Sequence, residues 1–97
     1  MATYVALLKL TERGVKNVKE SCKRAADFKT RAKKLGMEVR EQLWCLGAYD
    51  GVLIFEAPDD DTATAAMLSL AEGDNVSTQT LRCFGAQEMS RILEKVW

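Results

Sequence analysis

The chain has 97 residues, which is the size of one domain, and it carries 14 basic and 14 acidic side chains. It contains no histidine, which removes the usual metal ligand and excludes a Ser-His or Cys-His nucleophile. No apolar run approaches the roughly 20 residues of a membrane span, and the first residues lack the basic region of a signal peptide. We therefore expect one cytoplasmic domain over residues 1–97, with no cofactor, no metal and no membrane partner.

The three cysteines are too far apart to form a paired motif. Cys22, Cys45 and Cys83 include no CxxC spacing, so neither a zinc ribbon nor a thioredoxin-type redox site is indicated. Each cysteine also occupies an apolar position of its segment. We expect buried, reduced thiols that pack as small hydrophobic side chains.

Charge is unevenly distributed along the chain. Residues 13–34 are predominantly basic, whereas residues 56–74 contain acidic side chains and no basic one. Nucleic-acid binding is one interpretation of the basic segment. The aromatic residues that would stack on bases lie elsewhere, however, and the net charge is zero. We favour solvated helix faces of opposite sign and expect no nucleic-acid partner.

The first part of the chain predicts a strand followed by a long helix. Residues 4–10 form an apolar run too short for a helix of its own, which is typical of a buried strand. Nothing breaks a helix over residues 15–35, although Ser21 offers a second helical start and predicts that the helix is divided there. Gly36 ends it. The helix presents one apolar stripe, made of Val18, Cys22, Ala25, Ala32 and Leu35.

Two further strands follow, joined by a tight reversal at residues 46–48. Residues 37–45 alternate between apolar and polar side chains, which predicts a strand with one solvated face. Residues 51–55 are continuously apolar, and Pro58 stops this strand. In the alternating strand, Met37, Val39, Leu43 and Cys45 are expected on one face, and Glu38, Arg40 and Gln42 on the other.

The last part of the chain predicts a helix, a strand and a second helix. Residues 59–61 supply an N-cap and acidic first-turn residues, and Gly73 terminates the helix that they begin. Residues 75–84 have strand character and are largely polar. The tail carries Met89, Ile92, Leu93 and Val96 at helical spacing, so we expect a short amphipathic helix that ends at Trp97.

The element order is therefore β-α-β-β-α-β with a C-terminal helix, which predicts an α+β fold. The first and third strands are apolar on both faces, which is typical of the centre of a sheet, whereas the second and fourth are half polar. This pattern predicts the ferredoxin-like antiparallel sheet order 4-1-3-2. Both helices then cover one face of the sheet, by the right-handed crossover rule.

That arrangement leaves the other face of the sheet exposed and apolar. Monomers rarely tolerate such a surface. Either the C-terminal helix folds across it or a second copy of the sheet does. Because the tail is short for a four-stranded sheet, we expect a symmetric homodimer, with higher assembly left open.

The segment 46–60 resembles the GYD-domain family of small prokaryotic proteins. The residues that match its pattern are Gly47, Tyr49, Asp50, Glu56, Ala57, Pro58 and Asp59, with flanking matches at Leu10-Thr11, Gly14, Arg24-Ala25, Gly73, Asn75-Val76 and Thr80-Leu81-Arg82. The resemblance implies a dimeric α+β barrel, in which two ferredoxin-like sheets pack face to face. It implies no particular activity.

The candidate ligand-binding residues are Trp44, Tyr49, Asp50, Glu56 and Arg82. The predicted hairpin brings Trp44 close to Tyr49, where both rings can line a cavity that has Asp50 and Arg82 as polar contacts. This cavity is expected either between the sheet and the helices or within the dimer barrel. Asp50 and Glu56 stand about 20 Å apart along an ideal strand, too far for paired acid–base catalysis. For each of Tyr49, Asp50 and Glu56 we favour an architectural role in the turns that flank the strand.

Two functional hypotheses follow. The first is a non-catalytic binding or assembly module that holds a small apolar or aromatic molecule. The alternative is a cofactor-independent enzyme of oxygenase or isomerase type, with Asp50 as proton acceptor and Tyr49 or Trp44 positioning the substrate. The alternative rests on fold analogy, which is a weak argument for function.

Overall fold

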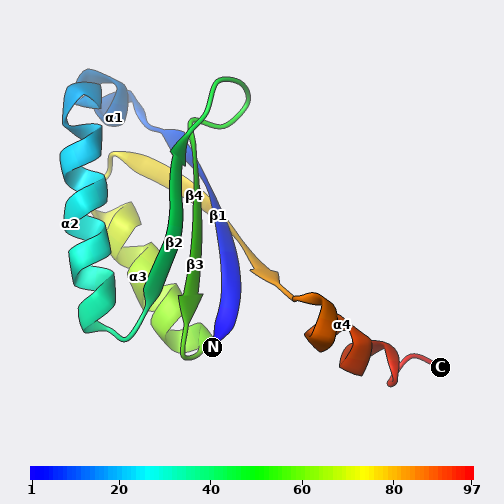
Figure 1. Cartoon of the computed structure of the whole chain (residues 1–97). Coiled ribbons are helices and arrows are strands. Elements are labelled where there is room, and N and C mark those ends of the chain that lie inside the picture. The colour runs from blue at the N-terminus through cyan, green and yellow to red at the C-terminus, as the bar shows by residue number, and fades with distance from the viewer.

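The computed structural model describes residues 1–97 and has the predicted order of elements. The strands are β1 (Ala2–Leu10), β2 (Glu38–Trp44), β3 (Gly51–Ala57) and β4 (Val76–Cys83). The helices are α1 (Glu12–Lys16), α2 (Ser21–Lys34), α3 (Asp60–Glu72) and α4 (Ala86–Leu93), with a 3-10 turn η1 (Val18–Glu20) before α2 (Figure 1).

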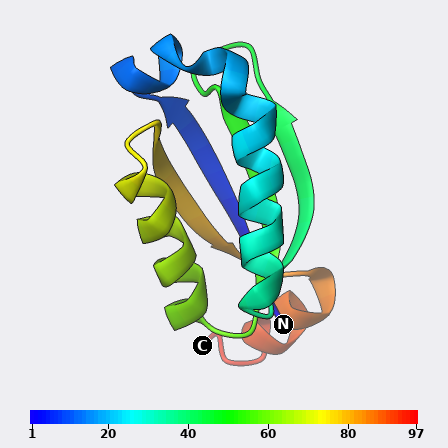
Figure 2. The ribbon, with the colours of Figure 1, turned by 90° about the vertical axis from the view of Figure 1, so that its left-hand side faces the viewer.

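The four strands form one antiparallel sheet with the order β2-β3-β1-β4. This confirms the predicted order, with the two strands that are apolar on both faces in the centre. Helices α2 and α3 lie side by side on one face of the sheet (Figure 2). The chain therefore has a ferredoxin-like α+β fold.

The hydrophobic core lies between the sheet and these two helices. Its strand side is built from residues that alternate along β1 and β3, and the rings of Tyr4 and Phe55 stack there with their centroids 5.2 Å apart. Only 10 apolar residues are buried, and Phe55 and Met37 are the largest that are fully enclosed. A core this small stabilises a domain modestly.

The long helix predicted for residues 15–35 is divided, as Ser21 indicated. Helix α1 ends at Lys16 with Asn17 as its C-cap, and the turn η1 separates it from α2. The predicted apolar stripe is partly wrong, because Val18, Cys22 and Leu35 are exposed. The turn η1 breaks the helical phase between Val18 and α2, and α2 instead faces the sheet with Ala25, Phe28 and Ala32.

The prediction for the faces of β2 is wrong beyond Val39. Val39 pairs with Phe55, but the next paired residue is Glu41, opposite Ile54, so Arg40 forms a β-bulge. A bulge adds one residue to one strand and reverses which face the following side chains occupy. Leu43 is therefore 51% exposed on the face away from the helices. Gln42 and Trp44 lie on the helix-covered face instead.

Two smaller expectations are corrected. All three cysteines are free thiols, as expected, but Cys22 and Cys45 are exposed and Cys83 is only partly buried. Cys22 lies on the outer side of α2, and Cys45 follows β2 in the hairpin loop. Helix α4 ends at Leu93, so the rest of the tail lies beyond it.

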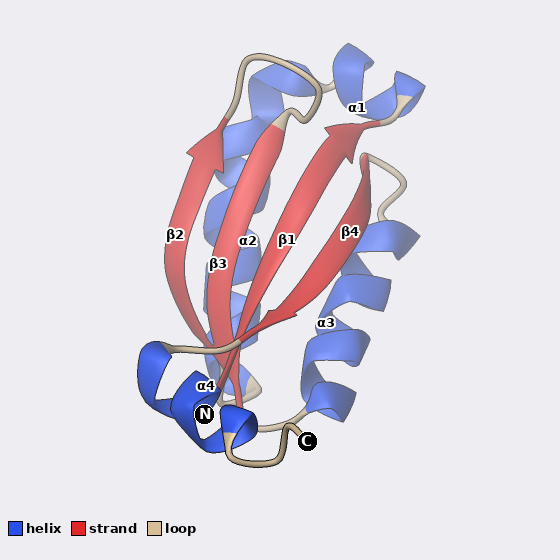
Figure 3. Cartoon of the chain, turned by 90° about the vertical axis from the view of Figure 1, so that its right-hand side faces the viewer, coloured by secondary structure: helices blue, strands red, loops and turns tan.

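The second face of the sheet, away from the helices, is uncovered. By the strand register its centre is apolar, and we call this surface the open face: Val5, Leu7, Leu43, Val52, Ile54 and Leu81. Helix α4 projects away from the end of β4 and does not fold across the open face (Figures 1 and 3). We predicted that either the C-terminal helix or a second copy of the sheet covers this face. In this structure the C-terminal helix does not cover it.

Candidate binding pocket

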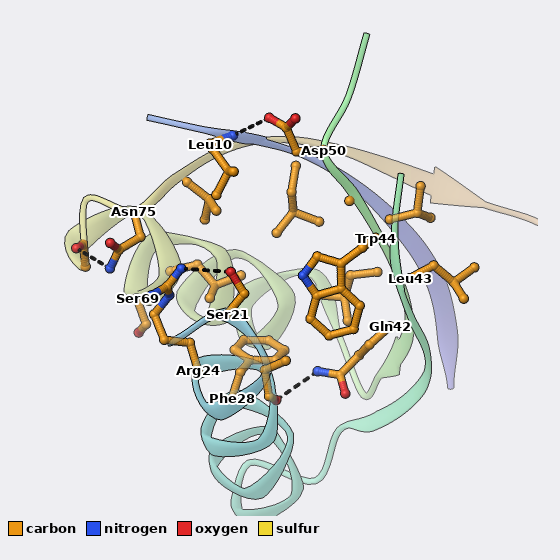
Figure 4. Close-up of a pocket in the computed structure, with 18 residues that line it drawn as sticks. Leu10, Ser21, Arg24, Phe28, Gln42, Leu43, Trp44, Asp50, Ser69 and Asn75 are labelled. Carbon is orange, nitrogen blue, oxygen red and sulfur yellow. Dashed lines mark hydrogen bonds between the residues drawn. The ribbon is translucent and has the colours of Figure 1, made fainter. Parts of the chain in front are cut away.

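A pocket of about 220 Å³ lies between the sheet and the helices, at the end of the sheet where β1 and β2 finish (Figure 4). Its lining comes from segments far apart in the sequence: β1, α2, β2, β3, the end of α3, the turn after it and the start of β4. The lining residues are Leu8, Leu10, Ser21, Arg24, Ala25, Phe28, Gln42, Leu43, Trp44, Asp50, Gly51, Val52, Leu53, Ser69, Leu70, Gly73, Asn75 and Val76. Apolar walls with a few polar groups are typical of small-ligand sites.

Two aromatic side chains, Phe28 and Trp44, line the pocket. The start of α2 after the turn η1 sets the position of Phe28, and the bulge in β2 sets the face on which Trp44 lies. Phe28 points in from α2, and Trp44 points in from the end of β2 (Figure 4). Trp44 is 56% exposed, so much of its indole remains open to the pocket and to solvent. Gln42, two residues earlier, donates from Nε2 to the carbonyl oxygen of Ala25 at 2.8 Å and joins β2 to α2.

One cation stands at the rim of the pocket. Arg24 donates to the carbonyl oxygen of Asn17 at 2.9 Å and to Oγ of Ser21 at 3.3 Å. The four ion pairs of the chain do not include Arg24. Its guanidinium is thus held in place by neutral acceptors and has no carboxylate partner.

Asp50 lies on the other side of the pocket and is bound to the backbone. Its Oδ2 accepts a hydrogen bond of 2.7 Å from the amide of Leu10, and its own amide donates to the carbonyl oxygen of Leu8 at 2.8 Å. The carbonyl oxygen of Asp50 accepts from the amide of Cys45 at 2.9 Å. These bonds tie the hairpin to the end of β1, which is the role expected of a turn aspartate.

The remaining three candidate residues lie away from this pocket. The Tyr49 hydroxyl donates to Oε1 of Gln79 on β4 at 2.9 Å, on the open-face side of the sheet. Glu56 also belongs to that side and forms an ion pair with Arg40. The structure therefore brings together Trp44 and Asp50 but not Tyr49, because the hairpin sends the two rings to opposite faces.

Arg82 lines a second, more polar hollow of about 440 Å³ between α3 and β4. Its guanidinium lies 5.7 Å from the centroid of the Tyr4 ring and 4.4 Å from that of Phe84. The Tyr4 hydroxyl donates to Asp60 in the same region. Burial, together with this hydrogen bond, raises the pKa of Tyr4 to about 12.

Several polar or aromatic lining residues were not among the predicted candidates, and Arg24, Phe28 and Gln42 matter most for the shape and charge of the pocket. Arg24 had one sequence signal, since it belongs to the segments that match the family pattern. Phe28 follows Arg24 by four residues, which puts both on one side of a helix. Gln42 carried no signal, because the bulge at Arg40 decides the face on which it lies.

The structure has no helix of the length and apolarity needed to cross a membrane. No group of three or more cysteine or acidic side chains is arranged to hold a metal ion.

The element order, the sheet order and the helical layer define a small ferredoxin-like α+β domain. The chain belongs to the GYD-domain family: the family model described as "GYD domain" matches residues 4–93. It is similar to a protein of Thermus thermophilus named "Glutamine synthetase and cystathionine beta-lyase binding protein". The two chains are 31% identical over 90 residues, which cover 92% of this chain and 95% of the relative. A comparison with solved structures found no match.

Proposed function

We propose that this chain is a non-catalytic binding module that works as a homodimer and docks on another protein. The observation that carries the proposal is the uncovered, apolar open face of the sheet. A second observation supports it: the relative that matches nearly the whole chain is named as a binding protein for two enzymes.

The dimer joins two copies through their open faces. Two sheets pack face to face about 10 Å apart when their inner faces are apolar, and six apolar residues form the middle of the open face. Leu43 and Leu81 are 51% and 50% exposed in one chain, so a second copy has apolar area to bury there. Such an interface would also enlarge a core that holds only 10 buried apolar residues.

Helix α4 extends the same interface onto the partner copy. It is held at its start by Glu88, which accepts from the amide of Gly85 at 3.2 Å and pairs with Arg82 at 3.3 Å. Its apolar side chains Met89 and Leu93 are 42% and 54% exposed. Because α4 continues from β4 at one end of the open face, a facing copy is the nearest surface on which these side chains can be buried (Figure 3).

The helical layer remains free in this dimer and provides the docking surface for a different protein. Helix α2 carries exposed basic side chains along its length, and none of them forms an ion pair within the chain. They are Lys23, Lys29, Arg31, Lys33 and Lys34. Helix α3 beside it begins with the acidic residues 59–61 (Figure 2). Two neighbouring surfaces of opposite charge fix the orientation of a partner that carries the complementary pattern.

The small apolar or aromatic molecule expected from the sequence has a place in this account: the pocket beside Trp44. A ligand bound there would lie beneath the α2 surface and could make docking responsive to its concentration. The enzymatic alternative has less support. It needs Asp50 as a proton acceptor, whereas Oδ2 of Asp50 already accepts from the amide of Leu10. Trp44 shares the pocket with Asp50, but Tyr49 is bonded to Gln79 outside it.

The proposal is tested by binding measurements with glutamine synthetase and cystathionine β-lyase from the source of this chain. We expect the wild-type chain to bind at least one of them, with an affinity that falls as salt is raised. Arg31→Glu should weaken this binding, whereas Lys95→Glu, at the far end of the molecule, should leave it unchanged. Ile54→Lys should produce a folded monomer. A monomeric wild-type chain that binds neither enzyme would contradict the proposal.

A further inference from the structure

We propose that the pocket beside Trp44 binds a small aromatic monocarboxylate, with the carboxylate paired to Arg24 and the ring between Phe28 and Trp44. This inference rests on the small-molecule part of the proposed function and names the class of ligand.

The size of the pocket limits the occupant to a small molecule. An apolar cavity of about 150 Å³ admits a benzene ring, whereas pockets for drug-sized ligands start at about 300 Å³. At about 220 Å³, this pocket has room for one ring with a short substituent. A nucleotide or a long acyl chain would extend well beyond it.

The walls favour an aromatic ring. Phe28 and Trp44 flank the opening on adjacent sides (Figure 4), and aromatic rings pair in offset or edge-to-face geometry. Trp44 is 56% exposed although it borders an apolar pocket, so its ring has a free surface for a ligand. Leu8 of β1 and Leu53 of β3 line the pocket from the sheet.

The charges favour a single carboxylate. A guanidinium has five N–H donors, and Arg24 uses two of them, on Asn17 and Ser21. It has no acidic partner in the chain, and arginine pairs with carboxylates through two parallel hydrogen bonds. Asp50 stands across the pocket from Arg24 (Figure 4) and would repel a second carboxylate at that end.

The test uses the full chain with Trp97→Phe, which leaves Trp44 as the sole tryptophan and therefore as the reporter. Three probes that share a phenylpropyl skeleton are titrated: 3-phenylpropanoate, its neutral amide 3-phenylpropanamide, and the cation 3-phenylpropylamine. Fluorescence of Trp44 and calorimetry on the wild-type chain report binding. We expect the carboxylate to bind about tenfold more tightly than the amide, and the amine to bind most weakly.

Variants assign the preference to Arg24. Arg24→Met should bring the carboxylate and the amide to similar affinities, whereas Arg31→Met, an arginine of the same helix outside the pocket, should keep the difference. Arg24→Lys retains the charge and replaces Arg24→Met in the experiment if that variant does not fold. It should keep part of the preference for the carboxylate over the amide. Equal affinities of the wild-type chain for carboxylate and amide would overturn the inference, as would a preference that survives in Arg24→Met.

The absence of binding by all three probes would also overturn the inference. Dimer mass and enzyme binding are measured without these probes, so this result would leave the dimer and the protein-docking proposal intact. If the wild-type chain is monomeric but still prefers the carboxylate, the dimer proposal would be contradicted and the ligand inference would stand.

Discussion

The carboxylate of Asp50 and the backbone amide of Leu10 are joined by a hydrogen bond of 2.7 Å between residues 40 positions apart in sequence. With the bonds that the Asp50 backbone makes to Leu8 and Cys45, this contact fixes the β2–β3 hairpin to the end of β1. The end of β1 and the β2–β3 hairpin also form one edge of the pocket, so the Asp50 side chain helps to hold that edge in place.

Replacing Asp50 should therefore cost stability. Asp50→Ala leaves the partly buried amide of Leu10 without its acceptor, and we expect the free energy of unfolding to fall by about 1–3 kcal/mol. Asp27→Ala is the matched control, because Asp27 is exposed on α2 and should change the value by less than about 0.5 kcal/mol. Urea unfolding followed by circular dichroism measures both. Equal stability of the two variants would contradict the role assigned to Asp50.

Gly14 supports the opposite wall through close packing. A Cβ at Gly14 would lie 1.9 Å from the carbonyl oxygen of Asn75, which itself accepts a hydrogen bond from the amide of Thr11 at 3.0 Å. Gly14→Ala must displace this backbone, and we expect a loss of about 1–3 kcal/mol in unfolding free energy. At Gly73 the nearest atom would be 3.4 Å away, so Gly73→Ala should be nearly neutral in the same urea experiment.

Tyr4 should make stability depend on alkaline pH. Its pKa is about 12 in the folded chain and 10.0 ordinarily, so between these values the folded chain keeps a proton that the unfolded chain has lost. The contribution of Tyr4 is complete below pH 10 and is lost as the pH rises towards 12. In Tyr4→Phe this part of the pH dependence should disappear. Urea midpoints measured from about pH 9 to 12 compare the two chains, and parallel curves would refute the assignment.

Removal of α4 should affect association more than folding. A chain that ends at Gly85 loses a helix that projects from the body, so we expect little change in the far-ultraviolet spectrum of the remaining fold. We expect the proposed dimer of the shortened chain to dissociate at higher protein concentration than that of the full chain, because the proposed contact of α4 with the partner copy is lost. Light scattering across a dilution series measures this. An unchanged midpoint of dissociation would exclude α4 from the interface.

The strand order was predictable because a strand that is buried on both faces needs apolar side chains at successive positions. β1 and β3 lie between neighbours in the sheet and have apolar side chains on both faces, and this pattern alone placed them in the centre. The helix caps were predictable for a similar local reason. Asp59 accepts from the amide of Thr62 at 2.8 Å, and Gly73 follows the last residue of α3.

The face on which a residue lies was less predictable. The extra residue at Arg40 reverses which side chains of β2 face the helices. No residue type in this segment predicts the bulge. The consequence reaches the pocket: Gln42 lies inside it against expectation. The hairpin similarly separates Tyr49 from Trp44, because a loop leaves the direction of each ring to tertiary packing rather than to sequence spacing.

The molecular mass of the wild-type chain in solution tests the central claim most directly. Sedimentation equilibrium should give twice the 10.8 kDa of the single chain, and Ile54→Lys, which places a charge in the open face, should return the mass to that of one chain while the fold is retained. A wild-type mass of one chain at every concentration tested would contradict the account, because the open face would then remain uncovered in a stable monomer.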